Sequence, residues 1–120
     1  MERRRATPAQ VAGDGAEDRA ARFLQRQGMR IVARNYRTRA GEIDLIGYEG
    51  ATLVFVEVRM RTAARFGDGA ESVDLGKQRR IEMAARHFLM RLGREPACRF
   101  DVVSLERDET RWIRGAVDAA

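Results

Sequence analysis

Residues 41–61, GEIDLIGYEGATLVFVEVRMR, constrain the fold more than any other stretch of this sequence, because they read as two strands joined by a tight turn. The runs 42–48 and 52–60 are rich in Ile, Leu, Val and Phe, which favour strands. Glu49-Gly50 between them suits a two-residue hairpin turn. The sequence therefore predicts an antiparallel hairpin that the rest of the chain must cover.

The register of this hairpin decides which side chains meet, because successive side chains of a strand point to opposite faces. With Tyr48 opposite Ala51, Asp44 lies opposite Phe55 and diagonal to Glu57. One face is then wholly apolar and needs a covering layer; its members are Ile43, Leu45, Val54, Val56, Val58 and Met60. The other face carries Glu42, Asp44, Ile46, Tyr48, Leu53, Phe55, Glu57 and Arg59. Three carboxylates on a half-apolar face indicate a functional site.

The carboxylates of this mixed face suit metal-dependent phosphodiester hydrolysis. Asp44 and Glu57 are diagonal neighbours, about 7–8 Å apart at the backbone and within joint reach of one metal ion. A metal-dependent nuclease needs hard oxygen ligands, a metal-activated water and a cation near the developing phosphorane charge. Asp44, Glu57 and the Val58 carbonyl would supply ligands for Mg²⁺ or Mn²⁺, and Arg59 would supply the cation.

A first helix is expected over residues 9–27, with Gly28 as its stop. Its apolar stripe directs Glu17 toward the sheet, where this side chain would add a further ligand. The alternative is an exposed glutamate that pairs with Arg19 or Arg22. The sequence pattern leaves both open.

A second helix is expected from an N-cap at Asp74 to Leu92, after a glycine-containing loop over residues 62–72 that can move. Its buried stripe is Ile81, Ala85, Phe88 and Leu92. Gln78 lies at the head of that stripe, either as a site residue or as a satisfied amide near the helix start. The other polar positions of the helix are basic: Lys77, Arg79, Arg80, Arg86 and Arg91.

Further strands are expected at residues 29–36, 99–106 and 111–114. The order of helix, three strands, helix, strand and a small terminal element predicts an α/β fold, an α/β/α sandwich around a central mixed sheet. A chain of 120 residues suits a single domain, here residues 9–120. Residues 1–8 are expected to form a disordered basic arm.

Charge and composition bound the partners. The chain has 23 Lys and Arg against 18 Asp and Glu, a net charge of +5, which indicates either a polyanionic partner such as nucleic acid or a solvated arginine-rich surface. No apolar run approaches the roughly 18 residues of a membrane helix, and no secretory signal is expected. The single Cys98 and single His87 exclude an intrachain disulfide and a Cys/His zinc site, so a reducing cytoplasm is expected. We expect His87 to be structural or on the surface.

Five segments together resemble a known family: GEIDLI, VFVEVRMR, RFGDGAESV, KQRR and RFDVV. They resemble the YraN-like group of small, uncharacterised bacterial proteins, which is similar to Holliday-junction resolvases of the PD-(D/E)XK nuclease superfamily. The resemblance covers roughly residues 10–118 and implies a restriction-endonuclease-like fold. By this resemblance, Glu17 matches the superfamily's first acidic position and Asp44 its metal-binding aspartate. Glu57-Val58-Arg59 matches its (D/E)XK element, and Gln78 matches its auxiliary glutamine.

This sequence departs from the superfamily pattern at Arg59, where the pattern has Lys. Arginine stays protonated in proteins and is a poor general base, although it can orient water or stabilise charge. Asp101 also lies in a matching segment. We expect it to be structural and to pair with Arg99 or with an arginine of the second helix.

Three functions follow as hypotheses. The first is a Mg²⁺- or Mn²⁺-dependent endonuclease that acts on branched or otherwise structured DNA, a substrate class implied by the resemblance alone. The second is a DNA- or RNA-binding module on the same fold without catalysis. The third is a protein-interaction adaptor with a basic face. The resemblance to junction resolvases also implies a homodimer.

Overall fold

The computed structural model describes residues 8–60 and 75–116, with side chains from Gly15 onward. Residues 1–7 of the basic arm expected over residues 1–8, the loop 62–72 and the N-cap at Asp74 lie outside these described residues. The elements are α1 (Pro8–Arg26), β1 (Arg30–Arg37), β2 (Glu42–Glu49), β3 (Thr52–Met60), α2 (Leu75–Leu92), β4 (Cys98–Leu105) and β5 (Thr110–Ile113). The predicted order of helices and strands is confirmed, and helix α1 already includes Pro8, which was assigned to the arm.

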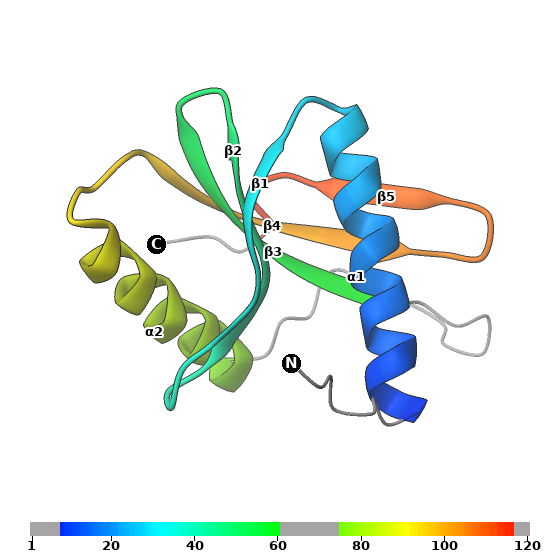
Figure 1. Ribbon diagram of the computed structural model, residues 1–120, viewed down its shortest axis with the longest axis horizontal. Coiled ribbons are helices and arrows are strands. Elements are labelled where there is room, and N and C mark those ends of the chain that lie inside the picture. The colour runs from blue at the N-terminus through cyan, green and yellow to red at the C-terminus, as the bar shows by residue number, and fades with distance from the viewer. Residues whose placement is uncertain (1–7, 61–74, 117–120) are drawn as a thin grey trace, which may run out of the picture.

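The five strands form one mixed sheet in the order β1-β2-β3-β4-β5. Strands β3 and β4 are parallel, and the other neighbouring pairs are antiparallel. Parallel neighbours need a long crossover connection, and the chain between β3 and β4 contains α2. Helix α1 packs on one face of the sheet and α2 on the other, which gives three layers (Figure 1).

Two apolar clusters hold these layers together. The cluster under α1 is Ala20, Ala21, Leu24, Met29, Leu45, Val54, Val56, Val103 and Leu105. The cluster under α2 is Ile43, Ile46, Tyr48, Leu53, Phe55, Ile81, Ala84 and Ala85. Leu45, Val54 and Val56, predicted to lie on the covered apolar face of the hairpin, pack under α1, so the prediction is confirmed for them. The prediction is wrong for Ile43, which packs in the cluster under α2, and for Met60, whose side chain is 60% exposed.

The predicted hairpin register is wrong by two residues. Tyr48 pairs with Leu53 instead of Ala51, so the turn is Gly50-Ala51, and Gly50 adopts the left-handed φ of 60° that favours glycine. A shift of two residues alone does not move a side chain to the other face, because the alternation has a period of two, and Ile43 departs from its predicted face beyond the end of the observed pairing. It does change the partners, since continuing the observed register places Asp44 in line with Glu57.

A buried ionic network closes the end of the sheet formed by β4 and β5. Asp101, 1% exposed, accepts hydrogen bonds from Arg99, from the Trp112 Nε1 (2.8 Å) and from the Gly115 backbone N–H (2.9 Å). Arg99 also reaches Glu49 at 2.7 Å. The expected structural role of Asp101 and its pairing with Arg99 are therefore confirmed.

His87 lies on the exposed face of α2, where its Nδ1 is hydrogen-bonded to the Tyr36 hydroxyl. The expectation of a surface or structural histidine is confirmed. Neither of the two described helices is long and apolar enough to cross a membrane.

Candidate active site

The site forms where β2 and β3 stop pairing. Their ladder runs from Glu49–Thr52 to Leu45–Val56 and goes no further. Beyond it, the Val58 backbone N–H donates to Asp44 Oδ2 at 2.7 Å. A side-chain carboxylate therefore takes the hydrogen bond that a backbone carbonyl of β2 would take in a continuous antiparallel ladder.

Glycine at position 41 holds the start of β2 away from β3. A Cβ on Gly41 would lie 1.9 Å from the backbone oxygen of Arg80 in α2, so only glycine allows this approach. Just after it, Glu42 still pairs with Arg37 of β1. The start of β2 thus follows β1 and α2 instead of β3, which explains why Ile43 packs in the cluster under α2.

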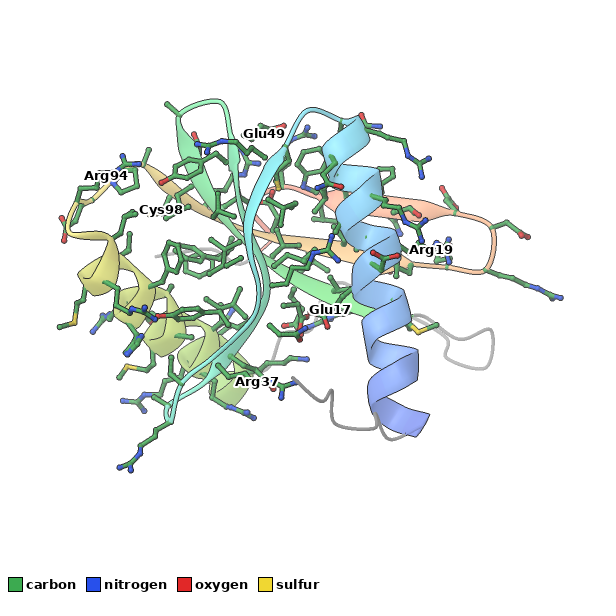
Figure 2. All side chains as sticks on the ribbon, in the orientation of Figure 1. Glu17, Arg19, Arg37, Glu49, Arg94 and Cys98 are labelled. Atoms are coloured by element: carbon green, nitrogen blue, oxygen red, sulfur yellow. The ribbon has the colours of Figure 1, made fainter. Side chains whose placement is uncertain are left out.

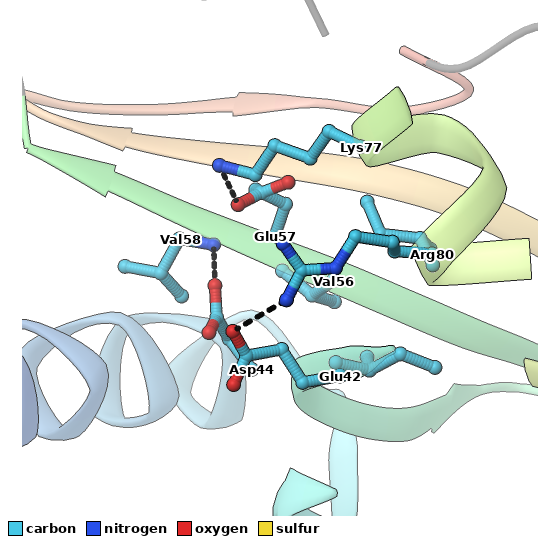
Figure 3. A pocket seen from close by; sticks show the side chains of 9 residues that line it. Glu42, Asp44, Val56, Glu57, Val58, Lys77 and Arg80 are labelled. Carbon is cyan, nitrogen blue, oxygen red and sulfur yellow. Dashed lines mark hydrogen bonds and ion pairs between the residues drawn. The ribbon is translucent and has the colours of Figure 1, made fainter. Parts of the chain in front are cut away.

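A cavity of about 290 Å³ fills the space between the diverging strands and the start of α2 (Figure 3). Three elements contribute three residues each. The lining residues are Glu42, Ile43 and Asp44 of β2, Val56, Glu57 and Val58 of β3, and Lys77, Arg80 and Ile81 of α2.

The pKa of Asp44 is raised to about 6 from its ordinary value of 3.8, and burial is the largest cause. The negative charges of Glu57 and Glu42 act in the same direction, while the Val58 N–H and the Lys77 ammonium oppose the shift. The ionised form of Asp44 is therefore costly in the folded protein, and a cation in the cavity would stabilise it.

Glu57 lies beside Asp44 and is held by one oxygen. Its side chain is 10% exposed, and its Oε1 lies 2.7 Å from the Lys77 ammonium. Its Oε2 is buried and has no hydrogen-bond partner among the described residues. A buried carboxylate oxygen without a hydrogen bond requires an explanation, and a bound cation is one that fits the chemistry of hard oxygen ligands.

The structure brings three of the predicted site residues together at this cavity: Asp44, Glu57 and Val58. Glu17 is 8% exposed and lies on the side of α1 that faces the sheet, so the alternative of an exposed glutamate is wrong (Figure 2). Glu17 does not line the cavity. In the described part of the chain, no three Asp, Glu, His or Cys side chains are gathered closely enough to hold a metal ion.

Arg59 and Gln78 do not line the cavity either. Arg59 is half-buried on β3 and pairs with Ser104 of β4, and Gln78 is half-buried in the first turns of α2. Their predicted catalytic roles remain predictions.

Lys77 and Arg80 are the cations that reach the site. Arg80 Nη2 lies 3.7 Å from Glu42 Oε1 at the rim, and Lys77 contacts Glu57. The sequence interpretation counted both with the charged surface of the helix. A signal for Lys77 was present, because it lies four residues before the buried Ile81 and therefore on the same helix face.

Comparison with known proteins places this chain in a family. The uncharacterised protein family UPF0102 matches residues 16–105, a span that contains the cavity-lining residues. The chain belongs to this family. The resemblance to the YraN-like group is thereby confirmed.

Relatives in UPF0102 match nearly the whole chain. A UPF0102 protein of Cupriavidus taiwanensis is 53% identical over 111 residues, which cover 92% of this chain and 85% of the relative. A UPF0102 protein of Nitrosospira multiformis is 53% identical over 111 residues, covering 90% and 93% of the two chains. One from an Acidovorax species is 50% identical over 119 residues, covering 96% and 90%.

Proposed function

We propose that this UPF0102 protein is a Mg²⁺- or Mn²⁺-dependent endonuclease that binds DNA and hydrolyses its phosphodiester bonds. One observation carries the proposal: Asp44 and Glu57 meet in a cavity where two strands part, and Glu57 Oε2 is buried there without a hydrogen bond among the described residues. The mixed sheet with one helix on each face agrees with a restriction-endonuclease-like fold, which we propose with it.

Asp44 and Glu57 would hold the metal ion, with the Val58 carbonyl as a further ligand, whereas Glu17, predicted as a ligand, does not line the cavity. A divalent cation bound there would supply a water of lowered pKa and neutralise charge on the phosphate. The Val58 N–H, which donates to Asp44 Oδ2, orients the Asp44 carboxylate for this role.

The charge of the whole chain supports a polyanionic substrate. The net charge is +5, and Arg80 at the rim is largely exposed, as is Arg37 on the neighbouring strand. Both guanidinium groups lie 3.6–3.7 Å from Glu42 oxygens, so this carboxylate balances part of their charge. The excess of positive charge over the whole chain attracts phosphate groups and makes binding depend on salt. Branched DNA as substrate, a homodimer and a cytoplasmic location are the expectations that the family resemblance and composition add.

The decisive experiment incubates the purified protein with four-way junction, flap, single-stranded and linear duplex DNA, in Mg²⁺, Mn²⁺ or chelator. We expect cleavage that requires metal and is lost in both Asp44→Asn and Glu57→Gln, while DNA binding survives. The Asn and Gln variants keep side-chain size and a hydrogen-bond acceptor, so a loss reports the charge.

A nucleic-acid-binding module without catalysis is the second candidate. The position of Arg59 favours it, because the residue that replaces the superfamily's lysine does not line the cavity. DNA binding without cleavage under every metal condition would support the module and contradict the nuclease.

A further inference from the structure

We propose that Lys77 is the cation of this site that acts on the substrate: its ammonium group pairs with Glu57 in the metal-free protein and would pair with a substrate phosphate once Glu57 held a divalent cation. This inference rests on the proposed function and names the residue that does what the sequence pattern assigned to Arg59.

The contact between Lys77 and Glu57 joins a half-exposed side chain to a nearly buried one. Glu57 is 10% exposed and emerges from the middle of the sheet, whereas Lys77 is 47% exposed and comes from the first turn of α2 (Figure 3). A lysine has a flexible four-carbon stem that carries a compact charge. Of the two partners, Lys77 is therefore the one with the freedom to exchange Glu57 for another anion.

Arg59 is placed differently. It lies two residues after Glu57 on β3, beside Ser104 of β4, and it does not line the cavity. Lys77 lines the cavity together with Asp44 and Glu57. Arg80 lines the same cavity but contacts Glu42 at 3.7 Å, so Lys77, at 2.7 Å from Glu57, is the cation in contact with a proposed ligand.

An ammonium group on Glu57 competes with any cation that uses the same carboxylate. Removing it should strengthen metal binding, and the effect should exceed that of removing a distant positive charge. An exposed ion pair contributes little, whereas the burial of Glu57 makes this pair stronger. We therefore expect Lys77→Met to bind Mn²⁺ about tenfold more tightly than the wild type.

Arg79→Met is the matched control for net charge. Arg79 lies in the same helix, is exposed and does not line the cavity. Calorimetric titration of Mn²⁺ without DNA should find its affinity within about twofold of the wild type, since screened charges at a distance contribute little. Equal affinity gains in Lys77→Met and Arg79→Met would overturn the competition.

Cleavage supplies the second measurement. On a DNA that the wild type cleaves, Lys77→Met should lower kcat by about 10²-fold, the usual cost of losing one group that stabilises developing charge, with KM changed only a few-fold. Lys77→Arg, which keeps the charge, should recover part of kcat. Wild-type kcat in Lys77→Met, or a larger loss in Arg59→Met, would refute the role of Lys77 while leaving the nuclease intact.

The two proposals fail differently. A wild type that neither binds metal nor cleaves DNA would contradict the nuclease and Lys77 together. Unfolding midpoints and circular dichroism must show that each variant folds. If Lys77→Met does not fold, Lys77→Gln keeps a hydrogen-bond donor toward Glu57 without the charge, and the same expectations apply to it.

Discussion

Replacing Asp44 with asparagine should stabilise the protein near neutral pH. The pKa of Asp44 is raised to about 6 by burial and by the nearby Glu57, above the ordinary value of 3.8 that applies in the unfolded chain. The folded protein therefore binds a proton more tightly than the unfolded chain does. Between these two values the folded state holds a proton that the unfolded state releases, so stability from this group falls as pH rises.

The cost follows from the separation of the two pKa values. They differ by about two pH units, and each unit corresponds to about 1.4 kcal/mol, so ionised Asp44 costs about 3 kcal/mol above pH 6. Asparagine removes the charge and still offers an oxygen to the Val58 N–H, which donates to Asp44 at 2.7 Å. The variant should be about 2–3 kcal/mol more stable than the wild type at pH 8, and the advantage should vanish near pH 4.

Urea unfolding of both proteins in chelator, at several pH values from 4 to 8, measures this difference. The charged groups around Asp44 are Glu57, Glu42 and Lys77, and all three are unchanged in the variant. Asp108→Asn, at an exposed turn position, is the control and should change stability by less than about 0.5 kcal/mol. An Asp44→Asn variant no more stable than the wild type at pH 8, or an advantage that is constant across pH, would refute the reasoning.

Three further predictions concern other parts of the molecule. Gly41→Ala would place a Cβ 1.9 Å from a backbone oxygen of α2, so we expect the free energy of unfolding, measured in urea, to fall by about 3 kcal/mol or more and cleavage to be lost. The control is Gly15→Ala, which has nothing within 4 Å of its new Cβ and should leave stability unchanged or raise it. Asp101→Ala leaves Arg99 without its buried partner and should lower the free energy of unfolding by about 3–5 kcal/mol, with unfolding monitored by the fluorescence of the single tryptophan. A loss below about 1 kcal/mol would contradict the network. Millimolar Mg²⁺ should raise the unfolding temperature of the wild type and leave that of Asp44→Asn unchanged, and an equal rise in both would place the metal elsewhere.

The order of the elements and the two faces of the hairpin could be predicted from local sequence. Runs of β-branched residues with turn signals between them predict strands, and face assignment depends only on odd or even position. This is why the mistake of two residues in the hairpin register left Leu45, Val54 and Val56 on their predicted face. Asp44 lies beyond the end of the observed pairing, and what brings it to Glu57 is the cavity where the two strands part.

The divergence of β2 from β3 could not be predicted, because it depends on contacts between distant parts of the chain. The close approach of Gly41 to α2 draws the start of β2 away from β3, and nothing in the local pattern of residues 41–48 shows it. Lys77 was missed for a related reason. Its charge suited a solvated helix face, and only the position of α2 over the sheet brings it to Glu57.

The hydrogen bond from the Val58 amide to Asp44 gives the site its own spectroscopic probe. An amide that donates to a backbone carbonyl is insensitive to titration, whereas this one donates to a carboxylate whose charge changes. Its proton resonance should therefore move as Asp44 gains a proton or a cation. One backbone signal near the end of β3 would then follow the state of the cavity, without a substrate.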